Sequence, residues 1–386
     1  MTGTHLRLSA TGKPDANGWD GDGLMKRFLV LAALAGSAFA QQNVAVYQEK
    51  GRFAGWPANH GIWSWNNEIV VGFEAGYFRV KTEAEHREHA IDYKRPEEHV
   101  LARSLDGGLT WSMEVPKSLQ PPEGSKVAGV PVETGGKQPV DSPGGIRFTD
   151  PNFAMTLRME DIHLGPSRFY YSYDRGKTWA GPFKIPNFGQ KGIAARTDYI
   201  VNGPSDCSVF LTAAKSNGKE GRVIHVRTQD GGKNWKFVSF VTPEPEGKDH
   251  AIMPATVRLS PTAMLSLIRY REFIDAYRSD DNGASWKLAS RVADTDNPPS
   301  VVKLKDGRLV VVYGVRKPPF GIRARISKDE GKTWGDEIML RKDGGSWDLG
   351  YTRSVLRPDG KIVSVYYFNE ASDRERYIGA TIWDPK

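Results

Sequence analysis

The sequence contains one cysteine, Cys207, in 386 residues. A single thiol excludes a disulfide within the chain, a disulfide-stapled fold and a zinc site built on cysteine ligands. The mean hydropathy is −0.50, and no long stretch shows the 3.6-residue apolar period of an amphipathic helix. No run of lysine and arginine suits nucleic acid, so the net charge of +7 indicates solubility or a preference for anionic substrates.

One short apolar run lies near the amino terminus. Residues 25–40 combine a basic start, an apolar middle too short to cross a bilayer and an Ala-Phe-Ala ending, which is the layout of a secretory signal peptide. We therefore expect residues 1–24 to be an upstream extension from a misassigned start, and residues 41–386 to be the mature protein. This layout predicts a secreted or periplasmic protein with no membrane span in its mature form.

Glycine and tryptophan, in contrast, are abundant, with 41 and 11 residues. Five of the tryptophans end an eight-residue pattern, Ser/Thr-x-Asp-x-Gly-x-Thr/Ser/Asn-Trp, which we call the box. The five copies are SLDGGLTW (104–111), SYDRGKTW (172–179), TQDGGKNW (228–235), SDDNGASW (279–286) and SKDEGKTW (327–334). Aspartate and serine side chains favour turns and glycine accepts a positive φ, so each box predicts a hairpin whose next strand starts at the tryptophan.

The spacing of the boxes predicts an all-β fold. Strand-like segments surround each box, and successive boxes are 48 to 68 residues apart, the length of a four-stranded unit with its loops. A sixth unit, residues 351–384, lacks a box and a fourth strand, which the segment Asn43–Gln48 can supply. We therefore predict one six-bladed β-propeller over 41–386, closed by the two ends of the mature chain. The long polar connections 77–97 and 118–145 are either solvated loops or rim loops over a central pocket.

These five boxes in six blades resemble the bacterial neuraminidase family, the exo-acting sialidases with Asp-box repeats. The resemblance implies an acid/base aspartate about a dozen residues before the first box, where Asp92 stands twelve residues before Ser104. It also implies a tyrosine nucleophile where the chain enters the innermost strand of the last blade, and Tyr351 stands there. A surface aspartate and a buried structural tyrosine are the alternatives.

The same resemblance implies three arginines that clamp the carboxylate of the sugar. Arg269, ten residues before Ser279, matches the second clamp arginine, and Arg316, eleven residues before Ser327, matches the third. Nearby competitors for these places are Arg271, Arg323 and Arg325.

Two departures from the family pattern stand out. The first clamp arginine is replaced by Gly55, and the glutamate that accepts the tyrosine proton is replaced by Met253. Arg196 and Asp198, at another inner-strand entrance, are candidate substitutes for the lost cation and base. Alternatives to these substitutes are Asp150, His250 and Asp348, with Arg353 as an alternative for the clamp. Trp56 and His60 are candidates to line the entrance of the first blade.

The resemblance thus implies a retaining exo-α-sialidase that acts on sialylated or other acidic glycans without metal or cofactor. Two alternatives remain open at this point: a propeller glycosidase or lyase for another acidic glycan, and a non-enzymatic propeller that binds glycan or protein. The sequence does not define the oligomeric state.

Overall fold

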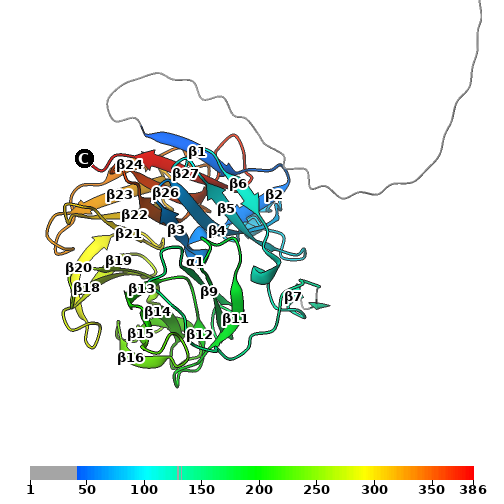
Figure 1. Ribbon diagram of the computed structural model, residues 1–386. Helices are drawn as coiled ribbons and strands as arrows, with labels where there is room; N and C mark the ends of the chain where they lie inside the picture. Colours follow the sequence, from blue (N-terminus) through cyan, green and yellow to red (C-terminus); the bar gives the residue numbers. More distant parts are fainter. Residues whose placement is uncertain (1–40, 128–129, 132) are drawn as a thin grey trace, which may run out of the picture. The chain divides into compact units, whose positions relative to one another are not determined.

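The computed structural model of the protein describes residues 41–127, 130–131 and 133–386. Their strands form six antiparallel sheets arranged in a ring, as the blades of a β-propeller (Figure 1). The predicted fold class is confirmed. The predicted extension 1–24 and signal peptide 25–40 lie outside the described residues. Within the described part of the chain, no helix has the length and apolar character needed to cross a membrane.

The first three blades follow one another along the chain. Blade 1 contains β2 (Arg52–Gly55), β3 (Ile62–Trp65), β4 (Glu68–Tyr77), β5 (Glu98–Ser104) and β6 (Ser112–Glu114). Blade 2 contains β9 (Ala154–Met159), β10 (Ser167–Ser172) and β11 (Ala180–Ile185). Blade 3 contains β12 (Ile193–Ala194), β13 (Tyr199–Gly203), β14 (Asp206–Ala214), β15 (Glu220–Thr228) and β16 (Lys236–Phe240).

The other three blades have four strands each. Blade 4 contains β17 (Ile252–Arg258), β18 (Met264–Arg269), β19 (Ile274–Ser279) and β20 (Lys287–Ala293). Blade 5 contains β21 (Ser300–Lys303), β22 (Leu309–Val315), β23 (Gly321–Ser327) and β24 (Ile338–Arg341). Blade 6 contains β25 (Gly350–Leu356), β26 (Ile362–Phe368), β27 (Tyr377–Trp383) and, from the start of the described chain, β1 (Gln42–Tyr47).

The ring closes as the sequence predicts. Strand β1 pairs antiparallel with β27, with Val44 opposite Ala380. The hydrophobic core lies between neighbouring blades: Phe73 of blade 1 and Val365 of blade 6, for example, belong to one buried cluster. Closure by strand pairing leaves blade 6 with the same four-stranded sheet as blades 4 and 5.

The boxes form the predicted turns. In the first box, the Ser104 hydroxyl donates to an Asp106 carboxylate oxygen and accepts from Gly108 N, while Asp106 also accepts from Thr110 N at 2.9 Å. The Trp111 indole donates to the Gly108 carbonyl oxygen at 3.0 Å. The other four boxes repeat the serine or threonine and aspartate contacts. These contacts span eight residues, so local sequence suffices to specify each hairpin.

The expectation of four regular strands per unit is wrong for blade 2. The box of this blade follows its second strand, β10, instead of a third strand, so the strand that is missing is the innermost one. On the outer side, the connection 118–145 adds an edge through a parallel bridge between Val140 and Phe183. Val140 N donates to the Pro182 carbonyl oxygen at 3.1 Å. Among its described residues, this connection also contains the short hairpin of β7 (Lys126–Val127) and β8 (Val130–Pro131), which lies at the periphery in Figure 1. The last part of 118–145 therefore follows the outside of the ring.

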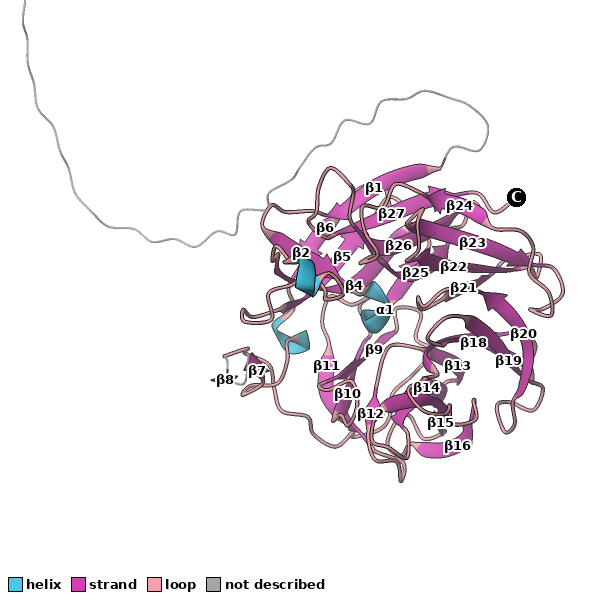
Figure 2. Ribbon diagram, turned by 180° about the vertical axis from the view of Figure 1, so that it is seen from behind, coloured by secondary structure: helices cyan, strands magenta, loops and turns pink. Residues whose placement is uncertain are grey.

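The space beside blade 2 near the axis is taken by the helix α1 (Pro57–His60), which lies between β2 and β3 and contacts β9 and β25 (Figures 1 and 2). The His60 carbonyl oxygen accepts hydrogen bonds from the hydroxyls of Thr156 at 2.8 Å and Thr197 at 2.6 Å. Short 3-10 helices occur at Glu83–Glu85 and Lys117–Leu119. A four-residue helix is thus held by polar contacts from blades 2 and 3.

Candidate active site

The inner strands of several blades are interrupted where the predicted site residues lie. In blades 1 and 3 the inner strand is split, by α1 and by the segment 195–198 respectively. In blades 4 and 6 it bulges, and Met253 and Tyr351 take positive φ values of 53° and 50°. A left-handed conformation costs a non-glycine residue about 1–2 kcal/mol, so packing and hydrogen bonds must hold these residues in place.

Tyr351 is fixed by its backbone. Its N–H donates to Asn297 Oδ1 at 2.8 Å, and a Cβ on the preceding Gly350 would lie 2.2 Å from the same oxygen. Gly350 itself has a φ of 104°. Only glycine fits beside Asn297, and this close approach sets the direction in which the Tyr351 ring leaves β25.

Tyr351 lies among arginines, as the sequence predicts. Arg269 Nη1 donates to the Tyr351 hydroxyl at 3.1 Å, and the Arg316 guanidinium carbon lies 5.4 Å from the centre of the Tyr351 ring. Burial raises the pKa of the Tyr351 phenol, but the charges of Arg269, Arg316 and Arg196 outweigh burial and lower the pKa below its usual value near 10. The three cations favour the phenolate form of Tyr351.

Arg196 is the third cation of this cluster, and it comes from the interrupted inner strand of blade 3. Its Nε donates to Asn59 Oδ1 at 3.1 Å, and its Nη1 forms an ion pair with Glu220 at 3.0 Å. The structure thus brings together Tyr351, Arg269, Arg316 and Arg196. We call these four residues the Tyr351 cluster.

Met253 occupies the place next to Tyr351 where the family resemblance implies a glutamate. Its sulfur lies 3.5 Å from Arg269 Nη1, and it packs with Ala58 and Tyr351. Among the described residues, no carboxylate forms a hydrogen bond with the Tyr351 hydroxyl. The charges of the arginines, rather than an adjacent base, lower the pKa of the phenol here.

Arg316 is oriented from behind by a chain of polar groups. Its Nη2 donates to the Tyr367 hydroxyl at 3.0 Å, and that hydroxyl donates to Asp348 Oδ1 at 2.9 Å. Asp348 also accepts hydrogen bonds from His89 and Arg376. Burial raises the pKa of Asp348, but the hydrogen bond from His89 and the charges of Arg376 and Arg316 hold it below the usual range.

Asp348, an alternative substitute at the site, and His60, a candidate for the entrance of blade 1, are both buried. Both side chains have 0% exposure, because Asp348 is covered by its protein partners and His60 lies under β4. In this conformation, neither is presented to a substrate. Trp56 is 7% exposed and packs between Phe53 and His89, so it supports the entrance of blade 1.

Asp198 and Arg353 form a buried layer beside α1. Asp198 accepts hydrogen bonds from Thr256 N at 3.2 Å and the Thr256 hydroxyl at 2.7 Å, and burial raises its pKa to about 7. Arg353 Nη2 donates to the carbonyl oxygens of Ala58 and Thr197. Both residues brace the inner strands, and no contact joins Asp198 to Tyr351 among the residues described.

The predicted acid/base, Asp92, lies in the connection 77–97. Its Oδ1 accepts a hydrogen bond from Lys94 N at 3.0 Å, which closes a turn within the same loop. From the same loop, His89 hydrogen-bonds to Asp348, which accepts from the Tyr367 hydroxyl behind Arg316. The loop that carries Asp92 therefore reaches the polar groups behind Arg316, although Asp92 makes no hydrogen bond to the Tyr351 cluster among the described residues.

The connection 77–97 also covers the entrance of blade 6. The indole of Trp347 donates to the His86 carbonyl oxygen at 2.6 Å, and the Trp347 ring lies 5.2 Å from the Arg316 guanidinium carbon. Beside Arg316 lies a cavity of about 230 Å³. The cavity is lined by Arg271, Glu272, Asp294, Thr295, Asp296, Val315, Arg316 and Lys317. Sequence reasoning missed Trp347, although it precedes Tyr351 by only four residues.

Comparisons with known proteins bear on this arrangement. Residues 155–364 match the family described as the BNR repeat-like domain. The chain belongs to this family. A sialidase from Bacteroides fragilis is 26% identical over 303 residues, and a xyloglucanase from Acetivibrio thermocellus is 23% identical over 302 residues. The match covers 66% of this BNR-repeat chain and 52% of the sialidase, and 72% of the chain but only 32% of the xyloglucanase.

Solved structures share the fold of this BNR-repeat protein. A Dyadobacter fermentans protein of unknown function has a TM-score of 0.66 at 20% identity, covering 89% of this chain and 98% of that chain. A Penicillium chrysogenum α-L-arabinanase has a TM-score of 0.59 at 16% identity, covering 90% and 99%. A Trypanosoma rangeli sialidase mutant with trans-sialidase activity has a TM-score of 0.57 at 14% identity, covering 90% and 60%. These likenesses confirm the sialidase-like propeller fold.

Proposed function

We propose that this protein is a retaining exo-glycosidase that removes a terminal acidic sugar, with sialic acid as the preferred residue and Tyr351 as the nucleophile. The observation that carries this proposal is the position of the Tyr351 hydroxyl, which accepts a hydrogen bond from Arg269 and lies in the field of three guanidinium groups. The names of the relatives, a sialidase and a xyloglucanase, support a glycosidase.

In the first step, the Tyr351 phenolate oxygen forms a bond to the anomeric carbon while the glycosidic carbon–oxygen bond breaks. The leaving oxygen takes a proton from the Asp92 carboxyl group. In the second step, water attacks the anomeric carbon, Asp92 takes the water proton, and the phenolate of Tyr351 leaves. Two displacements at one carbon retain its configuration.

The arginines have two roles in this scheme. Their planar donors suit the carboxylate of an acidic sugar, and their charges lower the pKa of the Tyr351 phenol. The three guanidinium charges also matter for approach, because they offset the phenolate charge that would otherwise repel the sugar carboxylate beside the reacting carbon. The Tyr351 cluster therefore favours acidic over neutral sugars.

The test is release of free sialic acid from an aryl sialoside by the purified protein. We expect Tyr351→Phe and Asp92→Asn each to remove most of the turnover, since one deletes the nucleophile and the other deletes the proton donor. Tyr171→Phe is the matched control, because Tyr171 lies on β10 in blade 2, far along the ring. Unchanged turnover in both site variants would overturn the assignment.

A second candidate keeps the site and changes the sugar. Met253 and Gly55 stand where the sialidase resemblance implies a glutamate and an arginine, and these departures favour a glycosidase or lyase for another acidic glycan, such as a uronic-acid polysaccharide. Screening acidic glycans separates the two reactions, since hydrolysis yields reducing ends alone and elimination also yields an unsaturated product. Glycan binding without any turnover would favour a non-enzymatic propeller instead.

A further inference from the structure

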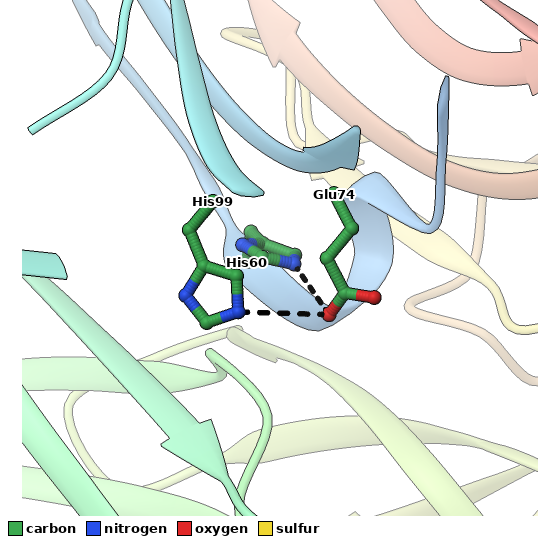
Figure 3. Close-up of side chains that lie close together, drawn as sticks. All are labelled: His60, Glu74 and His99. Carbon is green, nitrogen blue, oxygen red and sulfur yellow. Dashed lines mark hydrogen bonds and ion pairs between the residues drawn. The ribbon is translucent and has the colours of Figure 1, made fainter. Parts of the chain in front are cut away.

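A group of side chains in blade 1 has no role in the proposed reaction. His60 ends α1, Glu74 lies on β4 and His99 lies on β5 (Figure 3). Glu74 and His99 are directly opposite each other in the β4–β5 ladder, so their side chains share one face of the sheet. His60 reaches that face because a Cβ on Gly72 would lie 2.7 Å from the His60 Cβ, and glycine leaves the required space.

The three side chains point their ligand atoms at one another. His60 Nε2 lies 3.1 Å from Glu74 Oε1, and His99 Nε2 lies 4.0 Å from the same oxygen (Figure 3). The three ligand atoms all lie within 4.8 Å of one another. The two imidazole rings meet edge to face, with centroids 5.1 Å apart, so neither ring blocks the access of the other to a shared metal position.

The hydrogen bonds of His99 fix which of its nitrogens is free. His99 Nδ1 lies 2.8 Å from the Leu119 carbonyl oxygen, and a carbonyl only accepts, so Nδ1 carries the proton. In the neutral ring, Nε2 then presents a lone pair toward a carboxylate oxygen. A backbone carbonyl that holds the other ring nitrogen is the usual support for a metal-binding histidine.

The charge of Glu74 is not matched by an ordinary ion pair. Its ion-pair partners in the described part of the chain are the two histidines, and no lysine or arginine contacts its carboxylate. The nearby guanidinium of Arg158 donates through Nη1 to the carbonyl oxygens of His60 and Leu157, and its Nε and Nη2 have no hydrogen-bond partner in the described structure. The carboxyl group of Glu97 is a further neighbour of Glu74.

From this geometry we propose that His60, Glu74 and His99 bind a divalent transition-metal cation of the zinc class. Two imidazole nitrogens and one carboxylate oxygen form a ligand set that suits Zn²⁺ and leaves a fourth position for Glu97 or water. A tetrahedral ion with bonds of about 2.0–2.1 Å places its ligand atoms roughly 3.4 Å apart, between the two distances seen here. Calcium and magnesium prefer oxygen ligands and do not fit this set.

The bound cation links α1 to the Tyr351 cluster. It would join α1 to β4 and β5, and α1 carries Asn59, whose Oδ1 accepts a hydrogen bond from Arg196. Fixing α1 therefore fixes one of the three cations around Tyr351. The site itself is accessible, since the side chains of Glu74 and His99 are 19% and 10% exposed.

The experiment measures zinc binding to the full chain, without a histidine tag, after removal of metal by a chelator. We expect titration calorimetry with ZnCl₂ to give one site, Co²⁺ to give the visible absorption of a tetrahedral complex, and Zn²⁺ to raise the melting temperature. Glu74→Gln and His99→Gln should each weaken Zn²⁺ binding about 100-fold or more while leaving the circular dichroism spectrum unchanged.

His163→Gln is the matched control, because it removes one imidazole outside this group and should leave zinc affinity unchanged. Failure of the parent chain to bind Zn²⁺, or equal affinity in Glu74→Gln, His99→Gln and the parent, would overturn the proposal. If one of these variants misfolds, the other carries the test. Binding is read without turnover, so its outcome is independent of the proposed glycosidase reaction.

Discussion

Arg269 Nη1 lies 3.1 Å from the hydroxyl oxygen of Tyr351, at the entrance of the inner strand of blade 6. The two residues come from blades 4 and 6, so the propeller ring rather than any local motif brings them together. Arg269 Nη1 also contacts the Met253 sulfur, and Arg269 Nε has no hydrogen-bond partner in the described structure. This guanidinium therefore keeps one buried donor that no protein group among the described residues satisfies.

Replacing Arg269 should change the ionisation of Tyr351. Burial raises the pKa of Tyr351 and the arginines lower it, so Arg269→Gln should raise the pKa and reduce the phenolate fraction at neutral pH. Ultraviolet titration, with Tyr351→Phe subtracted, measures this pKa. Arg278→Gln on β19 is the control, since Arg278 pairs with Asp280 and Glu330 at the surface. The same titration curve in Arg269→Gln and the parent would contradict the electrostatic account.

The hydroxyl of Tyr367 should matter for substrate affinity more than for turnover. It joins Arg316 to Asp348, and losing a hydrogen bond of about 1 kcal/mol corresponds to roughly a fivefold increase in KM. Tyr367→Phe should show this increase with kcat largely kept. Tyr366→Phe is the matched control on the same strand, because the Tyr366 hydroxyl bonds to Thr381 away from the cluster. An equal effect of both variants on KM would indicate general loosening of β26.

Asp198 should make the protein less stable as the pH rises. Burial raises its pKa from 3.8 to about 7, so the folded state holds a proton that the unfolded state releases. Its stabilising contribution is complete below pH 4 and is lost as the pH rises through 7, by about 1.4 kcal/mol per pH unit within that window. Urea unfolding from pH 5 to pH 8 measures this slope.

Asp198→Asn should remove that slope. The amide can still accept from Thr256 N, and it can donate to the Thr256 hydroxyl, whose proton then turns toward Ser266 Oγ at 2.8 Å. The exposed Asp294→Asn serves as the control, and its unfolding free energy should follow the parent at each pH. A slope that persists in Asp198→Asn would assign the proton to another group.

Replacement by alanine should destabilise the protein more at a box glycine than at an ordinary turn glycine. Gly283 and Gly307 have similar φ values, 81° and 91°, but a Cβ on Gly283 would lie 2.4 Å from His225 Nδ1, while Gly307 has nothing within 4 Å. Both alanine variants incur about 1–2 kcal/mol of backbone strain, and Gly283→Ala adds about 1–3 kcal/mol of steric overlap. Chemical denaturation of both variants measures the difference, which would vanish if His225 could move aside freely.

Features that depend on residues close together in the chain were the most predictable from sequence. The Ser104–Asp106–Thr110 contacts lie within a single box, and the repeated strand pattern around the boxes led to the correct ring. The convergence of Tyr351 with Arg269 and Arg316 was also predictable, because each residue sits at the same end of its blade.

Features that depend on how loops fold back and on the exact register of strands were not predictable in this way. The burial of Asp348 depends on His89 from the 77–97 loop and on Arg376, and the sequence gives no indication that either lies nearby. The same holds for Glu74 and His99, which a strand pattern alone marks as ordinary residues of β4 and β5. Neither pairing nor burial of these side chains can be derived without the register of the sheet.

The closing pair of strands also determines when the protein can finish folding during its synthesis. The Thr381 hydroxyl donates to Asn43 Oδ1 across a sequence separation of 338 residues, so blade 6 stays incomplete until the last strand has left the ribosome. Until then, the edges of β1 and β26, which β27 joins in the sheet, are open to pairing with other chains. A ribosome that stalls before β27 should therefore yield an aggregation-prone product rather than a smaller functional propeller.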